Sequence, residues 1–533
     1  MARPDDPLPA IRHELHFGDR LVRCFADRPP SLFAMFEHSL AAGSDRLALV
    51  DPDGRLTYSQ LAQRVERLAA GLAARGVGVR DRVALLLGNG APFLISLLAC
   101  ARLGAIAVPL NIREQRDGLA YMLVQSGSKL LIHDAALTSR LPDLAATPML
   151  EHTLAVEGHS FGDLLEQNSR AAAPPVHRPA EEDVAVILYT SGTTGRPKGA
   201  MLTHLNIAHS VVHYRLAMDL TAQDRSLLAV PASHVTGLVA ILLAMVHVGG
   251  AIVAMPEFKA RAFLELAAAE RITHSVLVPA MYNLCLREPD FAQFDLSAWR
   301  IGAYGGAPMP AATVARLAEL LPDLALMNAY GATETTSPTT LMPRGHTAAH
   351  PDSVGKVVPC GEVRIMDPAG REVAPGEAGE VWIRGPMVMP GYWANNQATS
   401  DAFSAGFWRS GDIGALDADG YLYVFDRLKD MVNRAGYKVF GAEVESVLSR
   451  CPGVIEAAVV ARPDPILGEK TQAFVRTSDP AIGAEAVRAF CAERLADYKV
   501  PDFIALSEEP LPRNAAGKVL KAALRERIAK EMA

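Results

Sequence analysis

Apolar residues in the first third of the chain recur with the spacing of helices in some segments and of strands in others. Residues 57–76 carry leucine and valine three or four positions apart, begin with the capping-box pair Thr57 and Gln60, and end at a glycine. This pattern predicts an amphipathic helix. A second helix is predicted at 91–103, and apolar runs predict strands at 82–87, 105–110 and 130–133. Because helices and strands alternate, we expect a mostly parallel sheet with helices on both faces.

The most apolar stretch of the chain, 237–256, has the length of a membrane-spanning helix. It is interrupted by His247, Gly249 and Gly250, and a double glycine would break such a helix. The pattern therefore favours a buried helix at 238–248 followed by a buried strand at 251–255. No transmembrane segment is expected.

The second half of the chain changes character twice. Between 354 and 423 the predicted strands become short and turn signals dense, which favours a β-rich, barrel-like subdomain. After a charged stretch, the last hundred residues predict helices at 441–450 and 484–495, strands at 454–461 and 472–477, and a basic helix from Lys521. We therefore predict an α/β protein with a large N-terminal domain (1–426) of parallel α/β sheets plus a β-barrel-like subdomain, a hinge (427–430) and a small α+β C-terminal domain (431–533).

Composition narrows the classes of protein and partner. The chain has 533 residues, of which 50% are hydrophobic and 21% charged, as in soluble globular enzymes. Its net charge is −7 with histidines neutral, and without a basic stripe we expect no nucleic-acid partner. Six scattered cysteines include no Cys-x-x-Cys pair, so neither a zinc site nor a disulfide framework is indicated, and the N-terminus lacks a signal-peptide core. We expect a cytoplasmic protein and a homodimer.

One stretch, 189–199, has the composition of a phosphate-binding loop. It follows the apolar run 184–188, a predicted strand, and combines hydroxyl residues, glycines and a lysine. Glycines let backbone N–H groups approach an anion closely, and hydroxyls and lysine add donors and charge. The Walker loop is excluded because Lys198 follows Pro197 rather than glycine. The predicted phosphate-binding residues are Thr190, Ser191, Gly192, Thr193, Thr194, Gly195 and Lys198.

Further motifs follow this loop in order along the chain. They are Tyr330-Gly331-Ala332-Thr333-Glu334, Arg409-Ser410-Gly411-Asp412, Asp426-Arg427-Leu428-Lys429-Asp430 and Pro512-Arg513-Asn514-Ala515-Ala516-Gly517-Lys518. Together with the phosphate loop they resemble the acyl-adenylate-forming superfamily, which includes acyl-CoA synthetases, adenylation domains of peptide synthetases and firefly-type luciferases. The resemblance spans roughly residues 47 to 521.

The resemblance implies an ATP-dependent acid–CoA ligase with ATP, Mg²⁺ and CoA as cofactor and co-substrates. A carboxylate is a poor acylating agent, so it attacks the α-phosphate of ATP to give an acyl-adenylate and pyrophosphate. The thiol of CoA then displaces AMP. Because the first step brings an anion up to a polyanion, cations and oriented donors must offset charge in the transition state.

Roles for individual residues follow from the same resemblance. The phosphate loop would hold the β- and γ-phosphates, Glu334 would bind Mg²⁺, and Thr333 would donate to the α-phosphate. Lys518 would be the catalytic bridge between the carboxylate and the α-phosphate. Adenine would lie on Gly306, Ala307 and Pro308, with Tyr330 and its neighbours Ala329 and Gly331 on its other face. Asp412 would bind the ribose, and Arg427 the ribose or phosphate.

The family also rotates its small C-terminal domain between the two half-reactions. Lys429 aligns with the hinge of that rotation. One conformation would bring Lys518 to the site, and the other would bring the loop in which Gly436 leaves room for the pantetheine arm of CoA.

The identity of the acid substrate is the feature that the sequence indicates least clearly. Pocket candidates of mixed size and polarity are His234, Thr236, Tyr282, Ala303, Tyr304 and Ser337. Ser233 and Thr236 stand where the family often has aromatic residues, which widens or polarises the pocket. His234 either lines the pocket or is a satisfied core histidine. A medium-chain fatty or cyclic or aromatic monocarboxylate is expected.

Other functions stay open at this stage. An enzyme that loads a carrier protein's phosphopantetheine in trans would use the same residues. A non-catalytic nucleotide-binding protein is disfavoured because Thr193, Lys198, Glu334, Asp412 and Lys518 occur together. Nothing in the sequence points to a luciferase-type oxygenase.

Overall fold

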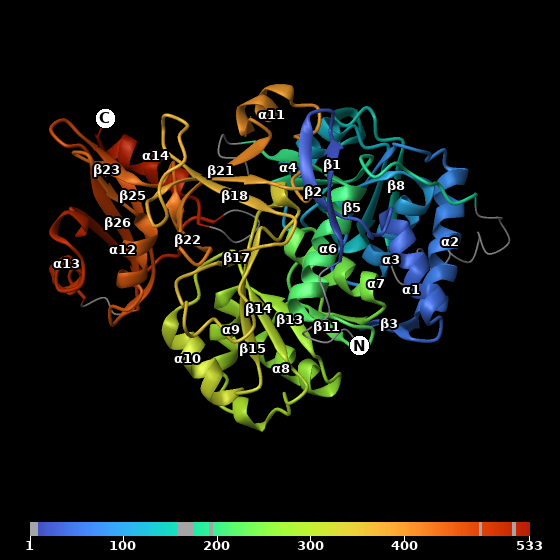
Figure 1. Ribbon diagram of the computed structural model, residues 1–533, viewed down its shortest axis with the longest axis horizontal. Helices are drawn as coiled ribbons and strands as arrows, with labels where there is room; N and C mark the ends of the chain where they lie inside the picture. Colours follow the sequence, from blue (N-terminus) through green and yellow to red (C-terminus); the bar gives the residue numbers. More distant parts are fainter. Residues whose placement is uncertain (1–8, 157–173, 191–195, 479–481, 514–518, 533) are drawn as a thin grey trace. The chain divides into compact units, whose positions relative to one another are not determined.

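The computed structural model describes residues 9–156, 174–190, 196–478, 482–513 and 519–532 (Figure 1). Contacts between residues divide the chain into two compact units. The first comprises Met1–Val363 and Ile383–Trp408, and the second Arg364–Trp382 and Arg409–Ala533. The predicted hinge at 427–430 and the domain limits set by it stay predictions.

The first sheet of unit 1 contains the strands that the apolar pattern predicted. Its order is β10-β9-β6-β5-β7-β8, with every neighbouring pair parallel except β9 and β10. The antiparallel pair was not predicted: the chain leaves β9, passes through the proposed phosphate loop and returns directly as β10. The strands are β5 (Arg82–Leu86), β6 (Ile106–Pro109), β7 (Leu130–Asp134), β8 (His152–Val156), β9 (Val184–Thr190) and β10 (Lys198–Thr203).

The second sheet of unit 1 has the order β17-β16-β15-β14-β13-β11-β12-β3-β4. Its central strands are parallel, and β4, β16 and β17 pair antiparallel to their neighbours. The strands are β3 (Leu47–Asp51), β4 (Gly54–Thr57), β11 (Arg225–Leu228), β12 (Ala251–Ala254), β13 (His274–Leu277), β14 (Ile301–Tyr304), β15 (Ala325–Tyr330), β16 (Thr340–Leu341) and β17 (Gly355–Val357).

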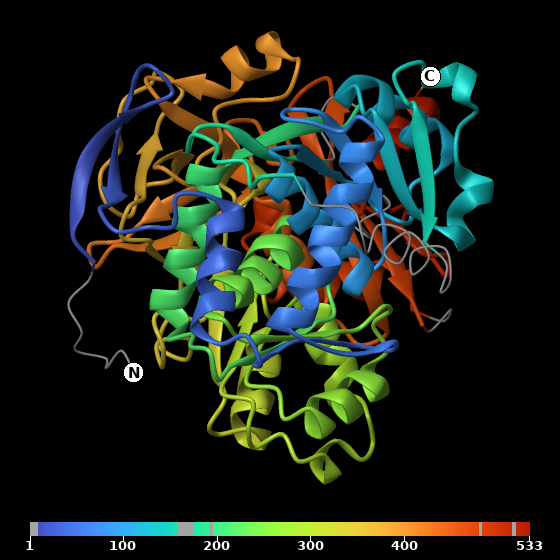
Figure 2. The ribbon, with the colours of Figure 1, turned by 90° about the vertical axis from the view of Figure 1, so that its right-hand side faces the viewer.

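A layer of helices separates the two sheets (Figure 2). Helix α3 lies on β5 and β6 of the first sheet, α2 and α7 lie on strands of the second, and α2 and α3 pack on each other. The capping box of Thr57 and Gln60 at the start of α2 is confirmed. The layer consists of α1 (Leu32–Ala42), α2 (Tyr58–Ala74), α3 (Ala91–Leu103), α6 (His204–Met218), the π-helix η3 (Thr236–Leu243) and α7 (Ala244–Val248).

Shorter helices surround this framework. They are α4 (Arg116–Ser126), η1 (Ala135–Arg140), η2 (Leu144–Ala146), α8 (Ala260–Ala269), α9 (Pro279–Leu286), η4 (Phe291–Gln293), α10 (Ala311–Leu320), η5 (Thr333–Thr335) and α11 (Asn396–Ala402).

The apolar stretch 237–256 forms η3, α7 and then β12, as a buried helix followed by a buried strand. Gly249 ends α7 in the left-handed conformation, with φ 71°. Across the described ranges, no helix combines the length and the apolarity needed to cross a membrane.

An N-terminal hairpin was not predicted. Strands β1 (Ile11–His16) and β2 (Arg20–Phe25) pair antiparallel through a tight turn at Phe17 and Gly18. The hairpin belongs to unit 1.

The β-rich segment is confirmed as β18 (Glu362–Met366), β19 (Gly379–Arg384), β20 (Phe403–Ser404), β21 (Phe407–Leu416) and β22 (Tyr421–Arg427). The boundary between the units falls inside β18, β19 and β21.

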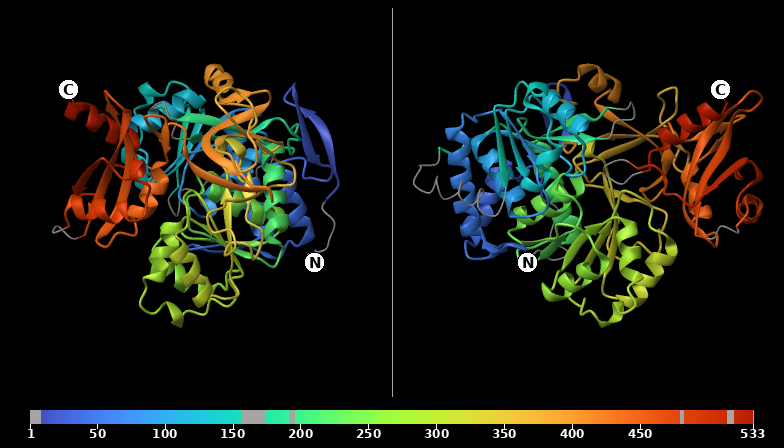
Figure 3. Two further views of the ribbon diagram at one scale, coloured as in Figure 1. Left: turned by 60° about the vertical axis from the view of Figure 1, so that its left-hand side comes forward. Right: turned by 180° about the vertical axis from the view of Figure 1, so that it is seen from behind.

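The C-terminal part of unit 2 is the predicted small α+β fold (Figure 3). Its sheet has the order β24-β23-β26-β25, with β27 parallel to β26. Helices α12 and α13 cover one apolar cluster and α14 another. The elements are β23 (Val432–Arg434), β24 (Tyr437–Val439), α12 (Gly441–Leu448), β25 (Val454–Asp464), β26 (Gly468–Thr477), α13 (Ala484–Ala492), η6 (Asp497–Lys499), β27 (Phe503–Ser507) and α14 (Lys521–Met532).

Candidate active site

The two ends of the predicted phosphate loop lie opposite each other. Thr190 is the last residue of β9 and Lys198 the first of β10, and the two are partners in the antiparallel ladder. The loop therefore starts and ends at one edge of the sheet. The predicted residues Ser191, Gly192, Thr193, Thr194 and Gly195, and the distant Lys518, lie outside the described residues.

Glu334 lies in a tight turn after β15. The Ala332 N–H donates to the Thr335 hydroxyl at 2.9 Å, and the Thr336 N–H donates to the Thr333 carbonyl at 3.0 Å. Thr336 follows in the left-handed region at φ 51°. The turn buries Thr333 and leaves the Glu334 side chain half-buried.

Tyr392 connects Glu334 with Lys198, and sequence reasoning missed it. Its hydroxyl donates to Oε1 of Glu334 at 2.9 Å, and its ring lies 5.2 Å from Nζ of Lys198. Burial, and then the neighbouring Glu334 carboxylate, raise the pKa of Tyr392, so its hydroxyl stays protonated as a donor. A cation and a carboxylate are thus held on one aromatic side chain beside the end of the phosphate loop.

The segment that carries Tyr392 is itself hydrogen-bonded to both sides. The Trp393 N–H donates to the Gly199 carbonyl at 2.7 Å, and the Met389 N–H donates to the Glu334 carbonyl at 2.9 Å. The sequence signal for this segment is weak: it consists of Gly391-Tyr392-Trp393 directly after a proline.

The predicted adenine surface lies at the carboxyl ends of β14 and β15. These strands are parallel neighbours, with Tyr304 opposite Asn328, so the segments that follow them, 305–308 and 329–334, leave the sheet at the same edge. Gly306, Ala307 and Pro308 are exposed, and Tyr330 is half-buried. Gly305 must be glycine because a Cβ there would meet the Ala329 carbonyl oxygen at 2.4 Å.

The candidate acyl-pocket residues divide into two groups. Tyr282 donates its hydroxyl to the Ala303 carbonyl at 3.0 Å, and Ser337 is hydrogen-bonded to Tyr214 at 2.7 Å, so these hydroxyls serve the fold. The hydroxyl of buried Tyr304, by contrast, has no hydrogen-bond partner among the described residues.

The exposed side chain of His234 argues against a core histidine, and its place in the acyl pocket stays a prediction. Its side chain is exposed, yet burial by the surrounding protein lowers its pKa. The lowered pKa favours the neutral ring at pH 7. The Thr236 N–H points to its Nδ1 at 3.4 Å, which leaves Nε2 to carry the proton.

The helix after His234 depends on a glycine. A Cβ on Gly237 would lie 2.2 Å from the Pro231 carbonyl oxygen. The close approach lets the π-helix η3 begin directly behind His234, and π-helices are frequent at functional sites.

We expect Gly237→Ala to destabilise unit 1 by about 1–3 kcal/mol, because the added methyl must displace backbone. Urea unfolding followed by circular dichroism measures this. Gly78→Ala is the matched control, since a Cβ there meets nothing closer than 3.9 Å. Equal stability of the two variants would contradict the prediction.

In unit 2, Asp412 on β21 and Arg427 on β22 are ladder partners, and Nε of Arg427 lies 3.4 Å from Oδ1 of Asp412. Both predicted nucleotide ligands therefore lie together. Lys429 follows two residues later, and burial lowers its pKa. Gly436 is exposed and adopts φ 92°, with no heavy atom within 4 Å of where a Cβ would be, and its role toward CoA stays a prediction.

Comparison with known proteins gives two family matches. AMP-binding enzyme matches residues 36–393, and AMP-binding enzyme C-terminal domain matches residues 443–518. The chain is 38% identical over 479 residues to a feruloyl-CoA synthase of Amycolatopsis sp., covering 89% of this chain and 94% of that protein. It is 35% identical over 491 residues to a long-chain-fatty-acid–CoA ligase of Mycobacterium tuberculosis, covering 91% and 96%.

A solved structure resembles most of the chain. The o-succinylbenzoate CoA synthetase of Bacillus subtilis in complex with ATP and magnesium ion superposes with a TM-score of 0.82 at 30% identity. The match covers 94% of this chain and 99% of that one.

Proposed function

The chain belongs to the AMP-binding enzyme family and is an AMP-forming acid–CoA ligase, and we propose that it activates an aromatic or cyclic monocarboxylic acid. The observation that carries the proposed ATP site is the arrangement of Thr190, Lys198, Tyr392 and Glu334 at the ends of the phosphate loop. The class of acid is supported by the likeness to a feruloyl-CoA synthase and by the polar pocket candidates.

The reaction has two steps with balanced bonds. A carboxylate oxygen of the acid attacks the α-phosphorus of ATP, a P–O bond forms, and the bond to pyrophosphate breaks. The CoA sulfur then attacks the acyl carbonyl carbon, a C–S bond forms, and AMP leaves with the C–O electron pair. The thiol proton passes to solvent.

In the first step, Thr190 and Lys198, with the loop between them, bind the β- and γ-phosphates. Glu334 fits Mg²⁺ because a hard cation prefers carboxylate oxygen, and bound Mg²⁺ offsets the charge of the polyphosphate. The Glu334 carboxylate accepts from Tyr392 through Oε1, which fixes its orientation. Thr333 donates to the α-phosphate, and Lys518 bridges it to the attacking carboxylate.

The nucleoside is held by separate groups. Asp412 accepts from the ribose hydroxyls and Arg427 donates to the ribose or phosphate. Adenine lies between Tyr330, flanked by Ala329 and Gly331, and the surface formed by Gly306, Ala307 and Pro308. For the second step the C-terminal domain turns about Lys429, and Gly436 admits the pantetheine arm.

The experiment supplies purified protein with ATP, Mg²⁺ and a panel of aromatic, cyclic and fatty acids, and follows AMP and acyl-CoA with and without CoA. The proposal expects acyl-CoA from aromatic or cyclic acids. Preference for medium-chain fatty acids would replace the proposed class of acid. Pyrophosphate exchange without thioester on CoA would favour loading of a carrier protein instead.

A variant of Tyr304 tests whether the acid carries a polar group that this side chain binds. If its unpartnered hydroxyl bonds a polar group on the substrate ring, Tyr304→Phe lowers kcat/KM for that acid by about ten-fold, the worth of one hydrogen bond. The same acid without its polar group is the control, and kcat/KM for it should not change. An equal loss for both acids would contradict this role.

Two further expectations concern the cellular location and the oligomeric state of the enzyme. We propose a cytoplasmic location, which the six buried, unpaired cysteines support because thiols persist in a reducing compartment. A homodimer is the proposed assembly, and sedimentation at catalytic concentrations tests it.

A further inference from the structure

The N-terminal hairpin touches the segment that holds Glu334. At the start of β2, Arg20 donates from Nη1 to the Met389 carbonyl at 2.7 Å and from Nη2 to the Pro390 carbonyl at 2.9 Å. Its guanidinium lies over the rings of Phe403 and Phe17, with Cζ 4.1 and 5.4 Å from their centroids. Arg20 is therefore fixed from several directions, and its planar fork fits the two carbonyls.

Those two carbonyls belong to the segment that reaches the candidate metal ligand. Met389 donates its own N–H to the Glu334 carbonyl, and Tyr392 donates its hydroxyl to the Glu334 carboxylate, each at 2.9 Å. One short segment thus takes two hydrogen bonds from Arg20 on one side and gives two to Glu334 on the other.

The hairpin can act as a fixed support because its other end is anchored by charge. Arg28 donates to the carboxylates of Glu14 on β1 and Glu181 ahead of β9, in bonds of 2.7–2.8 Å. His16 is hydrogen-bonded to Glu182 at 2.8 Å. The hairpin therefore joins the residues that lead into the phosphate-loop strand to the segment that holds Glu334.

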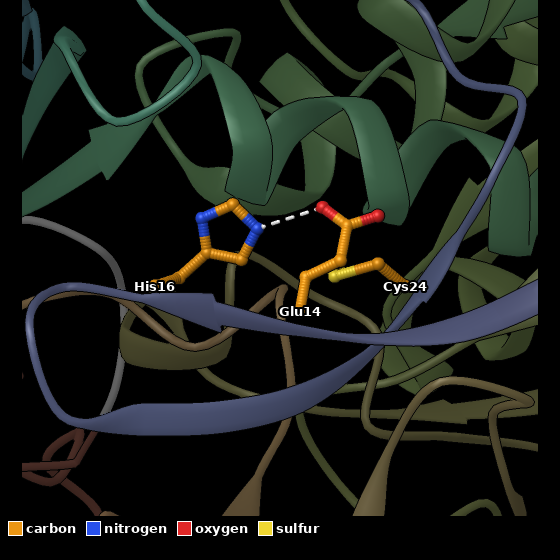
Figure 4. Close-up of side chains that lie close together, drawn as sticks. All are labelled: Glu14, His16 and Cys24. Atoms are coloured by element: carbon orange, nitrogen blue, oxygen red, sulfur yellow. Dashed lines mark hydrogen bonds and ion pairs between the residues drawn. The ribbon is translucent and has the colours of Figure 1, made fainter.

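Glu14, His16 and Cys24 also lie close together on the hairpin, with potential ligand atoms within 4.8 Å of one another (Figure 4). Their chemistry argues against a metal site. Both oxygens of Glu14 accept from Arg28, whose positive charge would repel a cation. Burial, and then the Glu14 charge, raise the pKa of the Cys24 thiol to about 12, so it stays protonated. The cluster is an anchor for the hairpin.

We propose that the N-terminal hairpin positions Glu334 for Mg²⁺ through Arg20 and Tyr392, which are positioning residues for the metal. The inference rests on the proposed role of Glu334 as metal ligand. It goes beyond the family match, because the hairpin precedes residue 36, where that match begins. A partner that orients a ligating carboxylate typically changes metal affinity by about 10- to 100-fold when it is lost.

The test measures ATP binding by calorimetry at increasing Mg²⁺ concentration, with neither acid nor CoA present. We expect Arg20→Met and Tyr392→Phe each to raise the Mg²⁺ concentration for half-maximal effect by about ten-fold. Arg20→Met should leave ATP binding in EDTA unchanged. Arg20→Lys, which keeps a cationic donor, should show a smaller increase. Because both residues act through one segment, the double variant should lose little more than either single variant.

Tyr58→Phe is the matched control, since it also removes a buried tyrosine hydrogen bond of 2.9 Å, to the Gly250 carbonyl. It should leave the Mg²⁺ dependence unchanged. An unchanged Mg²⁺ dependence in Arg20→Met, an equal shift in Tyr58→Phe, or multiplicative losses in the double variant would overturn the inference. If Arg20→Met does not fold, Arg20→Lys decides on the same titration. Acyl-CoA formation by the wild type tests the proposed function separately, so each proposal can fail alone.

Discussion

Replacing Lys518 by alanine is expected to slow acyl-adenylate formation by about 10²- to 10³-fold, as the loss of a transition-state charge partner does in other enzymes. In the proposed reaction Lys518 contacts the attacking carboxylate and the α-phosphate only in the first step. Thioester formation from preformed acyl-adenylate and CoA should therefore change far less. Single-turnover assays of the two half-reactions measure the two rates separately.

Lys530→Ala is the control for this variant, because Lys530 is an exposed lysine on α14 of the same unit. Both half-reactions should keep their wild-type rates. An equal loss of both half-reactions in Lys518→Ala would contradict a role confined to one conformation.

Local patterns predicted the framework of this fold well, because burial and capping act on neighbours in sequence. Apolar periodicity and glycines predicted three features correctly. These are the helix after Thr57, the strands of the first sheet, and the division of 237–256 into a helix and a strand. The strand before the predicted phosphate loop was placed correctly, as β9. The antiparallel strand β10 after the loop was not predicted, because its hydrogen bonds depend on pairing rather than on its own sequence.

The unpredicted parts depend on contacts between distant segments. Tyr392 meets Lys198 and Glu334 across long stretches of chain, and no local spacing encodes such a meeting. The N-terminal hairpin was not predicted for another reason. The inward side chains Glu14 and His16 of β1 are polar, so the strand lacks the apolar alternation by which a half-buried strand is recognised.

The polar inward face of the hairpin predicts a large effect of Arg28. All five guanidinium N–H groups are used: two meet Glu14, two meet Glu181 and one meets the Phe25 carbonyl. The Arg28 side chain is only 7% exposed and that of Glu14 16%. Arg28→Met removes the buried cation that Glu14 and Glu181 share and leaves Glu14 paired with the exposed Arg12, so we expect unfolding to become easier by about 3–5 kcal/mol.

The effect should also depend on pH in a definite direction. The hydrogen bond from Arg28 holds the pKa of Glu14 well below its usual range. A carboxylate with a lowered pKa adds stability above its unfolded pKa of about 4.3, and this stability is lost as pH falls towards the folded pKa. The difference in unfolding free energy between wild type and Arg28→Met should therefore be full at pH 7 and shrink below about pH 4.

Urea unfolding at several pH values measures this difference, with Arg316→Ala as the control. Arg316 forms an ion pair with Glu319 on the exposed surface of α10, so its loss should not move the unfolding midpoint at any pH. Glu14→Gln combined with Arg28→Met should cost less than the sum of the single changes, because the loss of Arg28 then no longer takes the buried cation from a Glu14 carboxylate. A pH-independent loss in Arg28→Met would mean that the hairpin is held by packing, and that its charges are incidental to the anchor.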